Sequence, residues 1–154
     1  MEQKFIAFIP ENIATRMESL SQQTKAHWGV MGAQHMIEHL LTVFMISNEK
    51  IKFAGVFREE TLPKRIAFLR GNEAFPRHVR IEGLPEDRPL PLRYADLQTA
   101  RQHLIDEINL FVSRKDMIEK NGPVHPVFGP LGFDDWVRFH RKHLSHHFRQ
   151  FGLI

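Results

Sequence analysis

Apolar residues recur every three or four positions in several stretches of the chain, which is the spacing of one buried face of an α-helix. In the first such stretch, Ile13, Met17 and Leu20 repeat in this way after Pro10. No segment alternates strongly between apolar and polar residues, as a half-buried β-strand would. The pattern therefore predicts four amphipathic helices, over residues 11–24, 32–48, 94–119 and 133–151.

The stretch between the second and third helices differs from the rest. Residues 50–92 contain five of the nine prolines and one short helical pattern, over residues 62–69. The four phenylalanines of this stretch argue against a disordered linker, because such linkers are poor in aromatic residues. We expect a long crossover connection, which two parallel neighbouring helices require. The predicted fold is all-α: a single four-helix-bundle domain over residues 1–154, with a long crossover between helices two and three.

Composition excludes several classes of protein. Hydrophobic residues make up 42% of the chain and charged residues 25%, an ordinary balance for a globular domain. The absence of cysteine excludes disulfides, thiolate metal sites and a cysteine nucleophile. A net charge of +3 is too small to indicate a nucleic-acid partner. The longest apolar run, residues 40–46, is too short to cross a bilayer, and the start of the chain lacks a signal-peptide pattern. We therefore expect a cytoplasmic protein without a membrane partner.

Histidines are concentrated in the fourth predicted helix, for which Gly132 or Asp134 is the expected cap. One face of this helix combines imidazole rings with large apolar side chains. Burying several polar rings costs free energy unless each finds a partner, and a metal ion suits two histidines one turn apart. A single histidine on such a face is usually a hydrogen-bonded core residue, and we interpret His146, at the edge, in that way. The face consists of Trp136, His140, His143, His147 and Phe151.

A pair of histidines supplies only two ligands, so a third must come from another helix. In the second helix, His39 falls within the apolar arc beside Val43, whereas His35 falls in the polar sector. We therefore predict that His39, His143 and His147 bind one divalent metal ion. Three imidazoles leave a coordination position open, as in catalytic sites, and a water molecule held there would be acidified.

Other residues near this predicted site are open to more than one role. His140 is the nearest remaining histidine and could support the ligands, shuttle protons or substitute for a ligand. Arg149 and Gln150 could orient the site or form a dimer contact. The pocket would be lined by Trp28, Met36, Trp136 and Phe151.

The basic residues of the fourth helix fall on the side opposite the histidines. We interpret them as a solvated face rather than as a surface that binds nucleic acid or phosphate. They are Arg138, Arg141, Lys142 and Arg149.

Several short motifs extend this pattern. The chain contains Trp28-Gly29-x-Met31 and Met36-x-x-His39, a turn that reads His125-Pro126-Val127-Phe128-Gly129, and a closing His143-x-x-His146-His147-x-Arg149-Gln150-Phe151-Gly152. In these motifs and in the order of its helices, the chain resembles the DinB-like superfamily, and in particular an uncharacterised branch with a His-Pro-x-Phe-Gly turn. Residues 50–92 have no matching motif.

The resemblance implies a four-helix bundle in which one histidine of helix two and a His-x-x-x-His pair of helix four hold a divalent metal, often nickel or zinc. Carried over residue by residue, this implies His39, His143 and His147 as ligands. Some members resemble transferases or isomerases that use low-molecular-weight thiols. The implied function is therefore that of a metal-dependent hydrolase or thiol transferase acting on an unidentified small molecule, and the protein could form a homodimer.

Two other interpretations stay open. The segment from His35 to His39 fits the H-x-x-E-H pattern of inverted zinc peptidases, but that class requires His35 as a ligand and an α/β pattern that is missing here. Alternatively, the chain is a non-enzymatic helical bundle, dimeric or partner-binding, whose histidines form a vestigial or sensory metal site.

Overall fold

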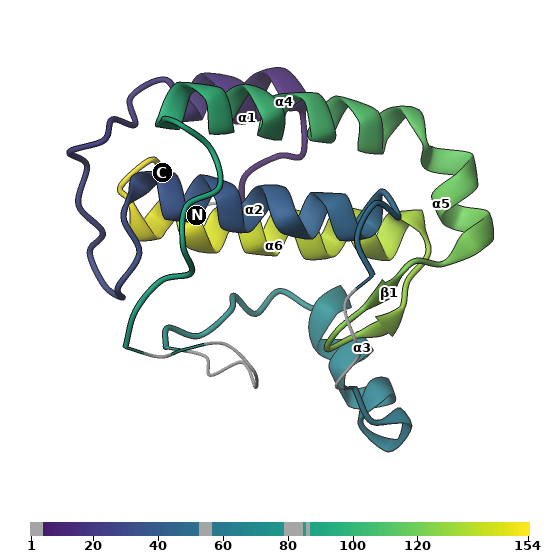
Figure 1. Ribbon diagram of the computed structural model, residues 1–154. Helices are drawn as coiled ribbons and strands as arrows, with labels where there is room; N and C mark the ends of the chain where they lie inside the picture. Colours follow the sequence, from purple (N-terminus) through teal and green to yellow (C-terminus); the bar gives the residue numbers. More distant parts are fainter. Residues whose placement is uncertain (1–4, 53–56, 79–84, 86) are drawn as a thin grey trace.

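The computed structural model describes residues 5–52, 57–78, 85 and 87–154, and most of them are helical (Figure 1). Two short strands, β1 (Val124–His125) and β2 (Gly129–Pro130), form an antiparallel hairpin. The prediction of a mainly α-helical protein is therefore confirmed for the described residues. The helices are α1 (Pro10–Met17), α2 (Ala33–Ser47), α3 (Leu62–Arg70), preceded by the 3₁₀ turn η1 (Glu59–Thr61), α4 (Leu97–Ser113), α5 (Lys115–Asn121) and α6 (Phe133–Gln150).

The longer helices are arranged as two pairs. α2 lies along α6, and α1 lies on α4 above them in Figure 1. Because α2 contacts both α4 and α6, it is buried on several sides, as its broad apolar arc predicts. No described helix is long and apolar enough to cross a membrane. The largest side chains with almost no exposure are Trp136, Phe44, Phe111, Phe148, Ile13, Met17, Met36, Ile37, Leu40, Leu41, Leu69 and Leu104.

The first helix is shorter than predicted. Pro10 starts α1, as proline favours the first helical position, but the helix ends at Met17 rather than at residue 24. The backbone N–H of Ser21 donates to Oγ1 of Thr24, at 3.0 Å. Hydroxyl side chains that bond the local backbone in this way compete with helix formation. The predicted second, fourth and short helices agree with α2, α6 and α3 to within about two residues.

The third predicted helix is broken into α4 and α5 at Arg114. The guanidinium of Arg114 donates to the carbonyl of Asn48 and pairs with Glu49, with 2.8 Å between Nη2 and Oε2. The amide of Asn48 donates to Oε2 of Glu107, at 2.8 Å. These contacts tie the end of α2 to the break, which occurs without glycine or proline.

The start of α6 is capped from a distance. Gly132 is the N-cap residue but offers no side chain, and the backbone N–H of Phe133 donates instead to Oε2 of Glu119, at 2.7 Å. A Cβ atom on Gly132 would lie 2.8 Å from that carboxylate oxygen. The predicted position of the cap is therefore correct, but Glu119 supplies the hydrogen bond.

The connection between α2 and α4 packs against α6. The rings of Phe68 and Phe75 stack with 5.7 Å between centroids, and Phe75 lies 5.9 Å from Phe139 of α6. Phe68 and Phe75 therefore pack against the core, which agrees with the argument against a disordered linker, while Phe53 lies outside the described residues.

Lys142 contradicts the interpretation of a wholly solvated basic face. This lysine is only 2% exposed, and its ammonium group donates to the carbonyl of Glu73. The same group lies 4.9 Å from the ring centroid of Phe5 and 4.6 Å from that of Phe68. The N-terminal segment and α3 cover this side of α6, which the helical pattern alone could not indicate.

Candidate metal centre

Histidines from two helices meet inside the protein. His39 projects from α2, while His143 and His147 lie one turn apart on α6. Nε2 of His143 lies 2.9 Å from Nε2 of His39 and 3.1 Å from Nε2 of His147. One ring nitrogen from each residue lies within 4.8 Å of the other two, so this histidine cluster could hold a metal ion. The structure thus brings together the residues that were predicted as a ligand set.

Hydrogen bonds alone do not satisfy the cluster. If Nε2 of neutral His143 carries the proton, it can donate to only one of its two neighbours. If Nδ1 carries it, the Nε2 lone pair of His143 faces the Nε2 lone pair of His147, because the proton of His147 is on Nδ1. Tetrahedral zinc, with Zn–N distances of about 2.0–2.1 Å, would place its ligand nitrogens roughly 3.3 Å apart. The donor set and its spacing therefore fit a divalent cation.

Burial keeps the rings of the cluster neutral. It lowers the pKa of His39 to about 4, with a smaller contribution from His146. Burial also holds the pKa of His143 and of His147 well below the usual value, and neighbouring imidazoles lower both further. Metal ions bind the neutral form of imidazole, so the rings are ready to act as ligands near neutral pH.

The three residues of the cluster differ in exposure. His143 and His147 are 8% and 7% exposed, whereas His39 keeps an intermediate exposure. The two histidines of α6 are therefore the more deeply buried members of the cluster.

The glutamine at the end of α6 orients one ring. Nδ1 of His147 lies 2.7 Å from Oε1 of Gln150 and donates to it, which leaves the Nε2 lone pair directed at the cluster. Nε2 of Gln150 donates in turn to the carbonyl of Trp28, at 2.9 Å. Histidines that bind metals usually have such a partner on the other ring nitrogen. Of the two roles open for Gln150 in the sequence, the structure thus provides the contact for orienting the site.

A glycine makes room for this arrangement. Gly29 has a φ of +83°, and a Cβ atom there would lie 2.8 Å from Nε2 of Gln150. The backbone N–H of His27 donates to the Gln150 carbonyl, at 2.7 Å. The loop before α2 and the end of α6 therefore hold each other, which explains the Trp-Gly pair of the first motif.

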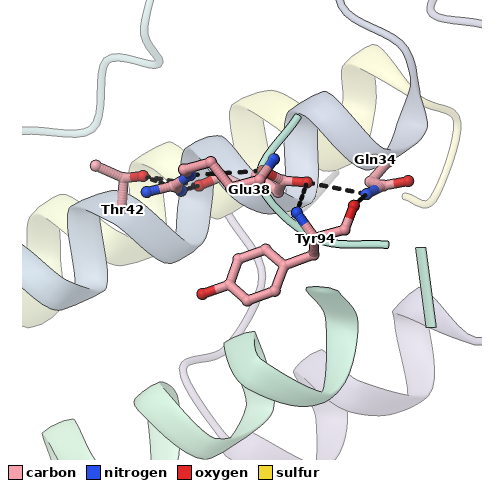
Figure 2. Close-up of polar contacts among 5 residues, drawn as sticks. Gln34, Glu38, Thr42 and Tyr94 are labelled. Carbon is pink, nitrogen blue, oxygen red and sulfur yellow. Dashed lines mark hydrogen bonds and ion pairs between the residues drawn. The ribbon is translucent and has the colours of Figure 1, made fainter. Parts of the chain in front are cut away.

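The competing zinc-peptidase arrangement does not form. Nδ1 of His35 accepts a hydrogen bond from the N–H of Gly32, at 3.1 Å, so this ring caps its own helix. Figure 2 shows that Glu38 is occupied as well: Oε2 accepts from Nε2 of Gln34, at 2.9 Å, and from the N–H of Tyr94, at 3.4 Å. His35 is thus not placed as a ligand, nor is Glu38 free to act as a base.

His140 shares a helix face with the cluster but has other partners. Its ring is 1% exposed and stacks on Phe44, with 3.7 Å between centroids. Its Nε2 donates to Oγ of Ser47, at 2.9 Å, because that hydroxyl itself donates to the Phe44 carbonyl. Among the described residues no hydrogen bond connects His140 to the cluster. Its roles as a proton shuttle or substitute ligand stay predictions.

The predicted pocket residues divide into two groups. Trp28 lies near the cluster, edge-on to His146 at 5.6 Å between centroids. Trp136 instead lies 5.4 Å from His125 and 5.3 Å from His140. Met36 and Phe151 are core residues with 0% and 3% exposure.

Phe75 was not predicted to lie near the site. Its ring centroid lies 6.4 Å from that of His143 and 6.3 Å from that of His146. It comes from the proline-rich connection, where no sequence motif indicated a contact with the fourth helix.

Comparisons with known proteins do not add to this geometry. No protein-family model matches the chain, and neither does a curated protein or a solved structure.

Proposed function

We propose that the protein is a metal-dependent enzyme of the DinB-like superfamily, in which α1, α2, α4 and α6 form a four-helix bundle. His39, His143 and His147 would hold one divalent ion. The observation that carries the proposal is the convergence of three neutral imidazoles from two helices, with Nε2 of His143 2.9 Å from that of His39 and 3.1 Å from that of His147. The motif resemblance favours nickel or zinc as the ion.

The residues present support small-molecule chemistry at this site. When bound, a divalent ion would supply Lewis acidity, which favours deprotonation of a water molecule or a small thiol near neutral pH. The protein holds the nitrogen donors in place, and Gln150 maintains the tautomer of His147. His143 and His147 are buried, so a substrate would approach from the side of His39, which keeps an intermediate exposure. Hydrolysis and thiol transfer are the reactions that this chemistry favours.

Metal analysis tests the proposal. Protein treated with a chelator, reloaded with nickel or zinc and dialysed should retain about one ion per chain. The variants H39A, H143A and H147A should each lose it, whereas H103A, at an exposed position on α4, should retain it. A folded wild-type protein that takes up neither ion would contradict the proposal.

A substrate screen separates an enzyme from a sensor. Loaded protein should turn over a member of a panel of hydrolysis and thiol-transfer substrates, and H143A should not. Tight metal binding without turnover across the panel would favour the non-enzymatic alternative.

A further inference from the structure

Arg77 is held over a tryptophan beside the histidine cluster. Its Cζ lies 4.0 Å from the ring centroid of Trp28. The indole packs edge-on against His146, and the Trp28 carbonyl accepts a hydrogen bond from Gln150, the residue that orients His147. Trp28 therefore connects the guanidinium to the residues around the cluster.

Arg77 has no acidic partner among the residues that the structure describes. Other arginines pair with carboxylates, as Arg70 does with Asp135, at 2.8 Å. Among the described residues, Arg77 has no such partner and contacts the face of Trp28 instead. Stacking occupies the face of the guanidinium but leaves its N–H groups, which lie in its plane, able to donate. The side chain is exposed, so a small molecule can reach these donors.

The charge beside the cluster comes from Arg77. Its guanidinium acts on the ring of His146, against which Trp28 packs. The ionisable groups that act on His39 and His147 are histidines, which burial keeps neutral. The guanidinium of Arg77 therefore favours an anion at this position.

We infer that Arg77 selects substrates that carry a carboxylate or phosphate group at a distance from the atom that reacts at the metal centre. A guanidinium matches two oxygens of either group in a bidentate contact. This inference rests on the proposed function, because the other end of the substrate is held at the histidine cluster. Arg77 is a specificity residue in this arrangement, and it needs no part in the chemical step.

A panel of small thiols, compared between wild type and variants, tests the inference. Cobalt-loaded protein, whose visible spectrum reports thiolate binding, is titrated with 3-mercaptopropionate, 6-mercaptohexanoate, 2-mercaptoethyl phosphate and the neutral 2-mercaptoethanol. At least one anionic thiol should bind about tenfold more tightly than the neutral one. R77Q should abolish this preference without weakening the binding of 2-mercaptoethanol, and R77K should keep part of it. If the carboxylate thiols show the larger gain in affinity over 2-mercaptoethanol, the group is a carboxylate; if 2-mercaptoethyl phosphate does, it is a phosphate.

A second arginine provides the control. R16Q makes the same change in net charge at an exposed position on α1 and should keep the preference. An R77Q protein with the wild-type preference, or an equal loss in R16Q, would overturn the inference. Metal content is measured on the same samples: a wild type without metal refutes the proposed function and this inference together, whereas a loaded protein without the preference refutes this inference alone.

Discussion

The two halves of α6 both contact buried histidines, but the ring nitrogens meet different partners. At the first half, Nδ1 of His125 accepts from the N–H groups of Val127 and Phe128, at 2.9 and 3.2 Å, and His140 bonds to Ser47. In the second half, the ring nitrogens of the histidine cluster face one another. Backbone N–H groups and a hydroxyl bond to the first set, whereas in the second set three Nε2 atoms are left facing one another.

Burial and acidity do not distinguish the two regions. Burial lowers the pKa of His125 to about 3, and it lowers the pKa of His39 to about 4. The pKa of His140 is also held well below its usual value by burial, and further by His125. A depressed histidine pKa therefore reports a dry environment, and only the hydrogen-bond geometry indicates which rings could bind an ion.

Removing one ring from each half should have the largest and most divergent effects. H143A should weaken metal binding by more than about a hundredfold, because it removes a direct ligand rather than an outer partner. H140A should bind metal normally but lose about 3 kcal/mol of stability, as other buried aromatic truncations do. Competition with a chelator and urea unfolding measure the two effects. A folded H140A protein that does not bind metal would show that both halves of α6 contribute to metal binding.

Acid should destabilise the metal-free protein through both regions. The buried histidines have lower pKa values in the folded state than the value near 6.5 of an unfolded chain, so the unfolded state binds more protons below that pH. The free energy of unfolding should fall as the pH drops from about 6.5, by up to about 1.4 kcal/mol per pH unit for each such ring.

A variant of the first region sharpens this prediction. H125N keeps an acceptor for the Val127 N–H but removes the titrating ring, so its stability should depend less steeply on pH between about 6.5 and 5. Urea unfolding at several pH values, in the presence of a chelator, is the measurement. Equal slopes for H125N and wild type would show that His125 does not contribute.

Changing the partner of a cluster ring should have a smaller effect than removing the ring. Q150L takes away the acceptor for Nδ1 of His147 and should weaken metal binding about 10–100-fold. Q150E keeps an acceptor at that position and should bind more tightly than Q150L. If Q150L is folded and binds metal like the wild type, the tautomer of His147 does not depend on Gln150.

The smallest effect is expected from a conservative change in the first region. H140F keeps the stack on Phe44 but loses the hydrogen bond to Ser47, whose hydroxyl still donates to the Phe44 carbonyl. The cost should be about 1 kcal/mol, measured by urea unfolding, with metal affinity unchanged. A loss as large as that of H140A would mean that the hydrogen bond, and not the stack, holds this region together.

The spacing of apolar residues was sufficient to predict those parts of the fold that depend on residues close together in sequence. The apolar periodicity predicts α2 and α6, and it places His39 on the buried side of its helix and His35 outside it. Contacts between distant residues were not predictable in this way. The Arg114 break, the Glu119 cap and the buried position of Lys142 each depend on a segment that lies far along the chain.

The sequence by itself determined the extents of α2, α3 and α6 and which histidines share an apolar face, because side-chain direction in a helix follows from spacing alone. Only the tertiary structure decided that α2 meets α6 at the level where Nε2 of His39 reaches Nε2 of His143. The register between two helices depends on how their side chains interlock and on the loops that connect them, and no periodicity within one helix encodes it.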